Sequence, residues 1–116
     1  MSDFTKAELF STASSNKVWL EASGVFTVPA LPGAGDTYGI ATIPHGFNSD
    51  QLIPQVLING GPTNGVVLPW SSNDGRITQY AYIDSTNLYI VCMSSDSSGS
   101  GASSFTINYF YRLLIL

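Results

Sequence analysis

The chain has 116 residues, enough for one folded domain, and 44% of them are hydrophobic, which is sufficient for a core. Charged residues make up only 10% of the chain, against about 25% in ordinary globular domains, and the net charge is −4. Four basic residues cannot form the positive surface that nucleic acid or an anionic membrane requires, so we expect binding to neither. A surface with so little charge costs little to bury, which favours an oligomer or a lattice subunit.

Short strand patterns separated by turn signals cover most of the chain. Seven stretches of the chain have such a pattern. Most of them alternate apolar and polar residues, and Pro, Gly, Asn, Asp or Ser separates one stretch from the next. A bulge or bend is expected at Gly24, and Pro54 is expected to delay the start of the third strand. In chain order, the expected strands are Lys17 to Val28, Tyr38 to Ile43, Gln55 to Ile58, Val66 to Trp70, Ile77 to Ile83, Leu88 to Met93 and Phe105 to Leu116.

Seven or eight short strands joined by short turns predict an all-β domain, an antiparallel β-sandwich of jelly-roll-like type, over residues 17–116. Residues 1–16 are expected to form a short N-terminal arm. Asp84 to Asn87 is typical of a hairpin turn, whereas the low-complexity segment Ser94 to Ser104 is expected to be flexible. The last strand is apolar on both faces toward its end, so a second sheet or a neighbouring chain should bury both.

Residues suited to catalysis are few. His45 is the only histidine, and we interpret it as a strand-end residue whose ring nitrogens bond to loop backbone rather than as a base or a ligand. Cys92 lies in an apolar run and is expected to be buried; as the only cysteine it excludes an internal disulfide. No Gly-x-Ser-x-Gly motif presents a nucleophile. We therefore predict a protein that is not an enzyme and holds no cofactor.

The eight carboxylates are scattered along the chain. Calcium is the metal that loop aspartates would suit best, but none follows a calcium-loop spacing, so turn formation is the preferred interpretation and no metal site is predicted. The aspartates concerned are Asp50, Asp74, Asp84 and Asp96.

Six Tyr, six Phe and two Trp are the remaining candidates for recognition, although core packing is the expected role for most of them. Trp70 precedes a polar turn and is the candidate for contact with a sugar ring. Tyr111, Leu114 and Leu116 in the last strand are candidates for a subunit interface.

Several segments resemble the small β-sandwich virion proteins of tailed bacteriophages. The resemblance covers residues 17–116, concerns strands and turns rather than a site, and therefore transfers no functional residue. The segments are Lys17-Val-Trp-Leu-Glu-Ala-Ser-Gly24, Phe26-Thr-Val-Pro29, Ala41-Thr-Ile-Pro-His-Gly46, Pro54-Gln-Val-Leu-Ile58, Tyr82-Ile-Asp-Ser-Thr-Asn-Leu-Tyr-Ile90 and Ser104-Phe-Thr-Ile-Asn-Tyr-Phe-Tyr-Arg112.

The resemblance implies a structural protein located in the virion. The start of the chain lacks the pattern of a secretory signal peptide, so synthesis in the host cytoplasm is expected. Small size favours a capsid decoration (cement) subunit that binds itself and the major capsid protein, and the resemblance implies a trimer, since phage decoration and fibre proteins often have that symmetry. The alternative is a tail-fibre or adsorption subunit that binds host surface glycan or a receptor.

Overall fold

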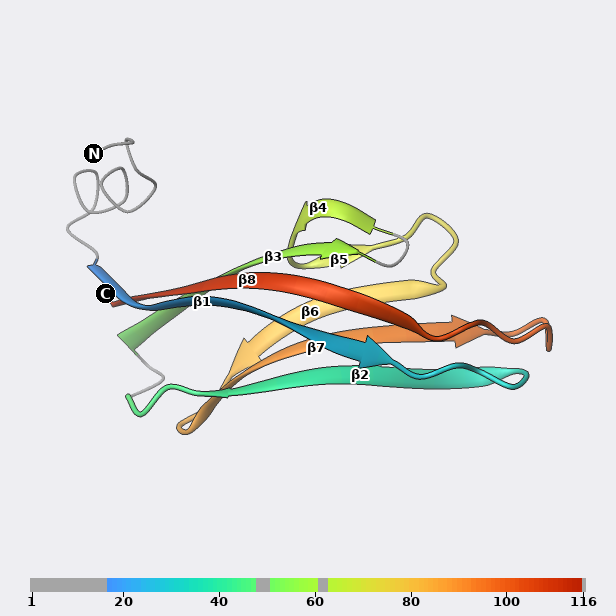
Figure 1. Cartoon of the computed structure of the whole chain (residues 1–116), viewed down its shortest axis with the longest axis horizontal. Coiled ribbons are helices and arrows are strands. Elements are labelled where there is room, and N and C mark those ends of the chain that lie inside the picture. Colours follow the sequence, from blue (N-terminus) through green and yellow to red (C-terminus); the bar gives the residue numbers. More distant parts are fainter. Residues whose placement is uncertain (1–16, 48–50, 61–62, 116) are drawn as a thin grey trace.

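The computed structural model describes residues 17–47, 51–60 and 63–115, which form an antiparallel β-sandwich of two four-stranded sheets (Figure 1). One sheet has the order β1-β8-β3-β4 and the other has the order β2-β7-β6-β5. The predicted all-β sandwich is therefore confirmed, while the expected arm at residues 1–16 lies outside the described residues. The strands are β1 (Lys17–Val28), β2 (Gly35–Pro44), β3 (Leu52–Gly60), β4 (Thr63–Val67), β5 (Trp70–Ser71), β6 (Ile77–Ile83), β7 (Asn87–Asp96) and β8 (Phe105–Ile115).

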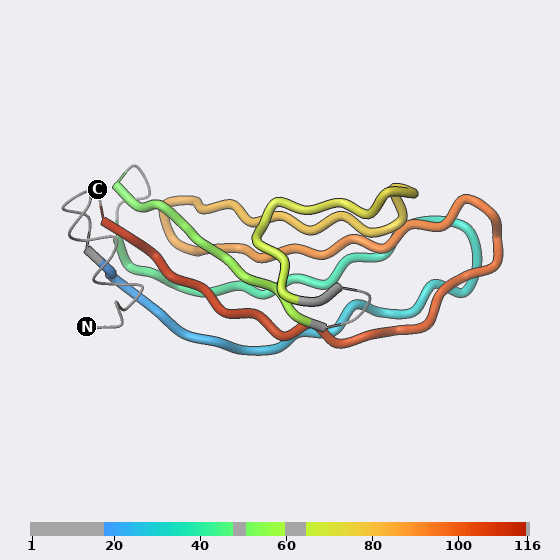
Figure 2. Tube along the Cα trace, turned by 90° about the horizontal axis from the view of Figure 1, so that it is seen from above, coloured from blue at the N-terminus to red at the C-terminus, as the bar shows by residue number. Residues whose placement is uncertain are grey.

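In each sheet a strand from the start of the chain pairs with one from its end. β1 pairs with β8 and β2 pairs with β7, while β3–β4 and β5–β6 are neighbours in both sequence and space. The β1–β2 and β7–β8 connections cross between the sheets at the same end of the sandwich, where they lie side by side (Figure 2). There Leu31 and Ala102 exchange two backbone hydrogen bonds of 2.8 and 3.0 Å. This bridge ties the two connections together.

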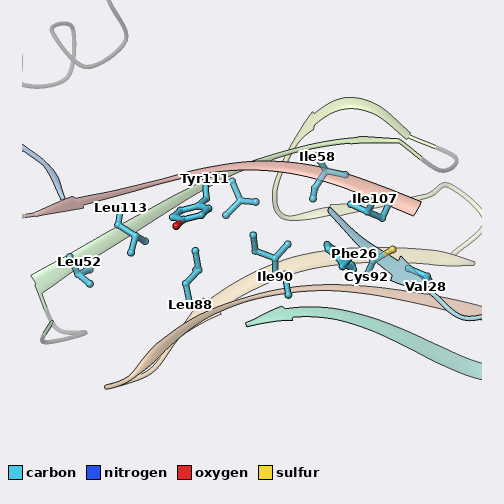
Figure 3. Close-up of a cluster of buried hydrophobic side chains, with 12 residues drawn as sticks. Phe26, Val28, Leu52, Ile58, Leu88, Ile90, Cys92, Ile107, Tyr111 and Leu113 are labelled. Carbon is cyan, nitrogen blue, oxygen red and sulfur yellow. The ribbon is translucent and has the colours of Figure 1, made fainter. Parts of the chain in front are cut away.

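The core lies between the sheets and is built from the inward side chains of both (Figure 3). Alternation along each strand sends every second residue inward, and burial of each large apolar side chain contributes roughly 1.5–3 kcal/mol. Its buried members are Phe26, Val28, Ala41, Leu52, Val56, Ile58, Leu88, Ile90, Cys92, Ile107, Tyr111 and Leu113.

The irregularity in β1 is not where the sequence predicted it. The register with β8 shifts between Val18 and Leu20, whereas Gly24 pairs regularly with Tyr109. The ring of Tyr109 occupies the space that a Cβ at residue 24 would need. The glycine therefore accommodates an aromatic ring rather than a bend.

Prolines explain two other differences from the predicted strands. β3 begins at Leu52 and includes Pro54, because β4 pairs with β3 only from Leu57 onward and leaves one edge open at the proline. A missing N–H costs no ladder hydrogen bond there. The predicted strand Val66 to Trp70 is in fact two strands, because the chain leaves one sheet after Val67 and enters the other at Trp70, with Pro69 in the crossing.

Candidate functional site

His45 is a structural residue at the end of β2, as predicted. Its ring is buried, Nδ1 accepts a hydrogen bond from the Phe47 N–H at 3.0 Å, and Nε2 lies 2.8 Å from the Asp84 carbonyl oxygen. Because Nδ1 is an acceptor, Nε2 carries the proton and donates it to that carbonyl. Both ring nitrogens are committed to main-chain groups, so the ring is not placed to accept a proton from a substrate.

Cys92 is buried in the core, also as predicted. Its neighbour across β6 and β7 is Gln79, a fully buried polar residue whose Nε2 lies 3.6 Å from the Cys92 Sγ. Burial raises the pKa of the thiol, and the hydrogen bond from Gln79 opposes this only in part. The thiol therefore stays protonated and is poorly suited to act as a nucleophile.

The aspartates in the described loops organise turns. Asp84 Oδ1 accepts the N–H groups of Thr86 and Asn87 at 2.8 and 2.7 Å, which closes the β6–β7 hairpin. These bonds hold the pKa of Asp84 below its usual value. Within the described ranges, no three His, Cys, Asp or Glu side chains gather as a metal site would require. Asp50 lies outside the described residues.

The proposed interface residues of the last strand have different surroundings from those expected. Tyr111 is 6% exposed and lies between the sheets, near Leu88 and Leu113 (Figure 3). Leu114 is on the opposite face of β8 and is only 3% exposed. A single chain therefore buries both side chains, and neither offers surface to a partner. Leu116 lies outside the described residues.

A patch of exposed apolar and aromatic side chains covers the outer face of the sheet formed by β2, β7, β6 and β5. We call it the tyrosine face and define it as Tyr38, Ile40, Tyr80, Tyr82 and Tyr89, from strands β2, β6 and β7. Four of them, all except Tyr89, are between 37% and 52% exposed. Strand register places Ile40, Val91 and Tyr80 in one row, and Thr42, Tyr89 and Tyr82 in the next.

Three of the tyrosine rings stack on one another. Tyr82 lies between Tyr80 and Tyr89, with ring centroids 6.2 and 4.8 Å apart and small interplanar angles. The three rings therefore form one continuous aromatic surface on the outside of the sheet. An extended aromatic surface of this kind suits contact with another protein.

Trp70 lines an open depression elsewhere on the molecule. The depression has a volume of about 460 Å³ and lies between β5, the start of β6 and the end of the β7–β8 connection. The half-buried side chains of Ile77 and Phe105 contribute apolar walls, and Asp74 and Arg76 contribute the charges. Serines from the β5–β6 turn, from β7 and from the β7–β8 connection complete the lining: Ser72, Ser94, Ser103 and Ser104.

Asp96, at the end of β7, holds this depression in shape. Its Oδ1 accepts hydrogen bonds from the N–H and the hydroxyl of Ser98 at 2.9 and 2.7 Å, and its Oδ2 accepts one from the Gly101 N–H at 2.6 Å. Arg76 Nη2 lies 3.3 Å from Oδ1. The bonds from Ser98 and Gly101 and the charge of Arg76 lower the pKa of Asp96 to about 2. The segment expected to be flexible is thus anchored at its base by a buried carboxylate.

Comparison with protein-family models, curated proteins and solved structures found no match to this chain. The described residues hold no helix with the length and apolar character needed to cross a membrane. Function must therefore be inferred from the geometry of the chain itself.

Trp70, the predicted sugar contact, lines a depression, and its role in binding stays a prediction; the contribution of β2 to the tyrosine face was not predicted. The signal was present in the size of alternate residues. In β2 the inward positions Gly39 and Ala41 are small, while the outward positions Tyr38 and Ile40 are large. Gly39 is small because β1 passes so close that a Cβ would collide with the Thr27 carbonyl oxygen.

Proposed function

We propose that this chain is a non-enzymatic structural subunit of a tailed-phage virion that decorates the capsid and stabilises the head. In this role it binds further copies of itself, as a trimer, and the major capsid protein. The observation that carries the proposal is the tyrosine face, an exposed set of large side chains on one outer sheet face. Exposed apolar patches on soluble domains commonly mark protein interaction sites.

The distribution of charge supports assembly through this face. Among the described residues, no charged side chain lies in the three rows from Tyr38 to Thr42 across β2, β7 and β6. Charges flank the rows instead, with Asp36 at one end and Asp84 at the other. Depletion of charge at the centre with a polar rim is the composition of many protein interfaces. Tyrosine is also among the residues that contribute most to binding energy.

The proposal is tested by removing the face without disturbing the core. The double variant Tyr80→Ser/Tyr82→Ser is expected to abolish self-association in analytical ultracentrifugation and co-sedimentation with purified particles. The matched control is Val25→Ser/Val67→Ser, which removes two exposed apolar side chains from the other sheet and should leave both unchanged. If the tyrosine variant associates as well as the wild type, the face is not the interface.

Placement on the particle needs a separate measurement. Immunogold electron microscopy with antibody against the chain should place gold over the heads of purified particles. Gold confined to tails or fibre tips would replace decoration with the role of an adsorption subunit. Particles without gold would overturn the virion proposal altogether.

A further inference from the structure

We infer that the depression beside Trp70 is a binding site for a neutral carbohydrate, with Trp70 as the stacking platform and Asp74 as the hydroxyl acceptor. The inference does not depend on assembly through the tyrosine face, which lies on the outer face of the sheet and shares none of the residues that line the depression. It concerns a second activity of the same chain.

The first step is the combination of residues that line the depression. Sugar rings present an apolar C–H face together with hydroxyl groups, and a site for them needs an aromatic surface beside polar groups. Trp70 supplies the aromatic surface, and Phe105 extends it as a second apolar wall. Asp74, Ser103 and Ser104 supply the polar groups. The volume of about 460 Å³ lies within the usual range for small-molecule sites.

The second step is that the carboxylate of Asp74 is held in a fixed orientation. Its Oδ1 accepts the Ser72 hydroxyl at 2.7 Å and the Arg76 N–H at 3.1 Å. Among the described residues, Asp74 Oδ2 accepts no hydrogen bond from another residue, so that oxygen can accept one from a hydroxyl group of a ligand. A charged acceptor makes hydrogen bonds roughly twice as strong as a neutral one.

The third step is charge, which selects a neutral ligand. Arg76 is the cation at the depression, and its guanidinium is paired with Asp96 at 3.3 Å. Together with Asp74 these groups have a net charge of −1, and among the described lining residues no second cation offsets it, so a sialylated, uronic or sulfated sugar would meet repulsion. The same negative charge disfavours stacking of a nucleobase that carries phosphate.

The inference is tested by nuclear magnetic resonance on the full chain labelled with ¹⁵N. The two tryptophans give two indole N–H signals, and Trp19, whose indole donates to the His45 carbonyl oxygen, is an internal control away from the depression. Neutral probes are glucose, galactose, N-acetylglucosamine and their oligomers; sialyllactose and a sulfated disaccharide are the acidic comparison. We expect at least one neutral probe to shift the Trp70 signal saturably while the Trp19 signal stays unchanged.

Variants separate binding from folding. Trp70→Ala should weaken the apparent affinity at least tenfold, and Asp74→Asn, which keeps the size of the side chain, should weaken it about threefold to tenfold. Tyr82→Ser, on the tyrosine face, is the control that should bind like the wild type. Because Trp70→Ala could disturb folding, Asp74→Asn and the wild-type titrations each test the inference alone. It is overturned if no neutral probe shifts Trp70, if both tryptophans shift alike, or if acidic probes bind more tightly.

Discussion

The ring of His45 and the main-chain carbonyl oxygen of Asp84 are 2.8 Å apart, and this contact joins the end of β2 to the β6–β7 hairpin. The same histidine accepts the Trp19 indole N–H on its carbonyl oxygen at 3.1 Å and donates its main-chain N–H to Thr86. One residue therefore connects β1, β2 and the hairpin at one end of the sandwich. Such a role explains a buried imidazole without any catalytic function.

Replacement of this histidine should destabilise the fold. His45→Ala leaves the Asp84 carbonyl and the Phe47 N–H without their partner, and we expect the free energy of unfolding to fall by about 2–3 kcal/mol. Urea denaturation measures the change. Thr42→Ala, at an exposed position of the same strand, should change stability by less than about 0.5 kcal/mol. Equal stability of the two variants would show that the ring contacts contribute nothing.

The buried thiol should be protected from modification. Because burial raises the pKa of Cys92, iodoacetamide at neutral pH should label the folded protein far more slowly than the urea-unfolded protein. Mass spectrometry over a time course measures both rates. Labelling of the folded chain at the unfolded rate would mean that β6 and β7 open readily around this residue.

Stability should depend on pH through Asp96. Its pKa is about 2 in the folded chain, below the ordinary value of 3.8, so its stabilising effect is complete above about pH 4 and is lost as the pH falls toward 2. We expect Asp96→Asn to be less stable than the wild type at pH 7 and to approach it near pH 2. Thermal unfolding across this range tests both statements. Ser97→Ala, in the same connection, should keep the wild-type acid profile.

Two glycines give a matched test of close packing. A Cβ at residue 24 would collide with the ring of Tyr109, whereas a Cβ at residue 33 would meet only the Gly99 carbonyl oxygen, at 4.0 Å. We expect Gly24→Ala to cost about 1–3 kcal/mol and Gly33→Ala to be nearly neutral. Chemical denaturation of the two variants measures the difference. A neutral Gly24→Ala would mean that Tyr109 can move away without loss.

Patterns within single strands were predictable, whereas relationships between strands were not. The alternating pattern predicted β6 with the correct ends, and the period of two that burial of one sheet face imposes puts Tyr80 and Tyr82 on the same face. It did not predict Gln79 in the core, since a buried amide depends on the Cys92 Sγ supplied by β7.

The candidate sites show the same limit. Trp70 could be selected from its neighbours in sequence, but Ser103 reaches the same depression from a segment more than thirty residues away. The tyrosine face likewise needs β2 beside β7 and β7 beside β6, an order that the alternation within each strand does not encode. The Pro54 position was misjudged for a similar reason, because its cost depends on where β4 begins to pair.

The pairing of Lys17 with Ile115 has a mechanical consequence. These residues lie at the same end of the antiparallel β1–β8 ladder, so tension applied between them would open the inter-strand hydrogen bonds one after another, as a zipper opens. Bonds loaded in sequence yield at lower force than bonds loaded together. The β1–β8 ladder should therefore separate at lower force when it is pulled by these two paired ends than when it is pulled by its opposite ends.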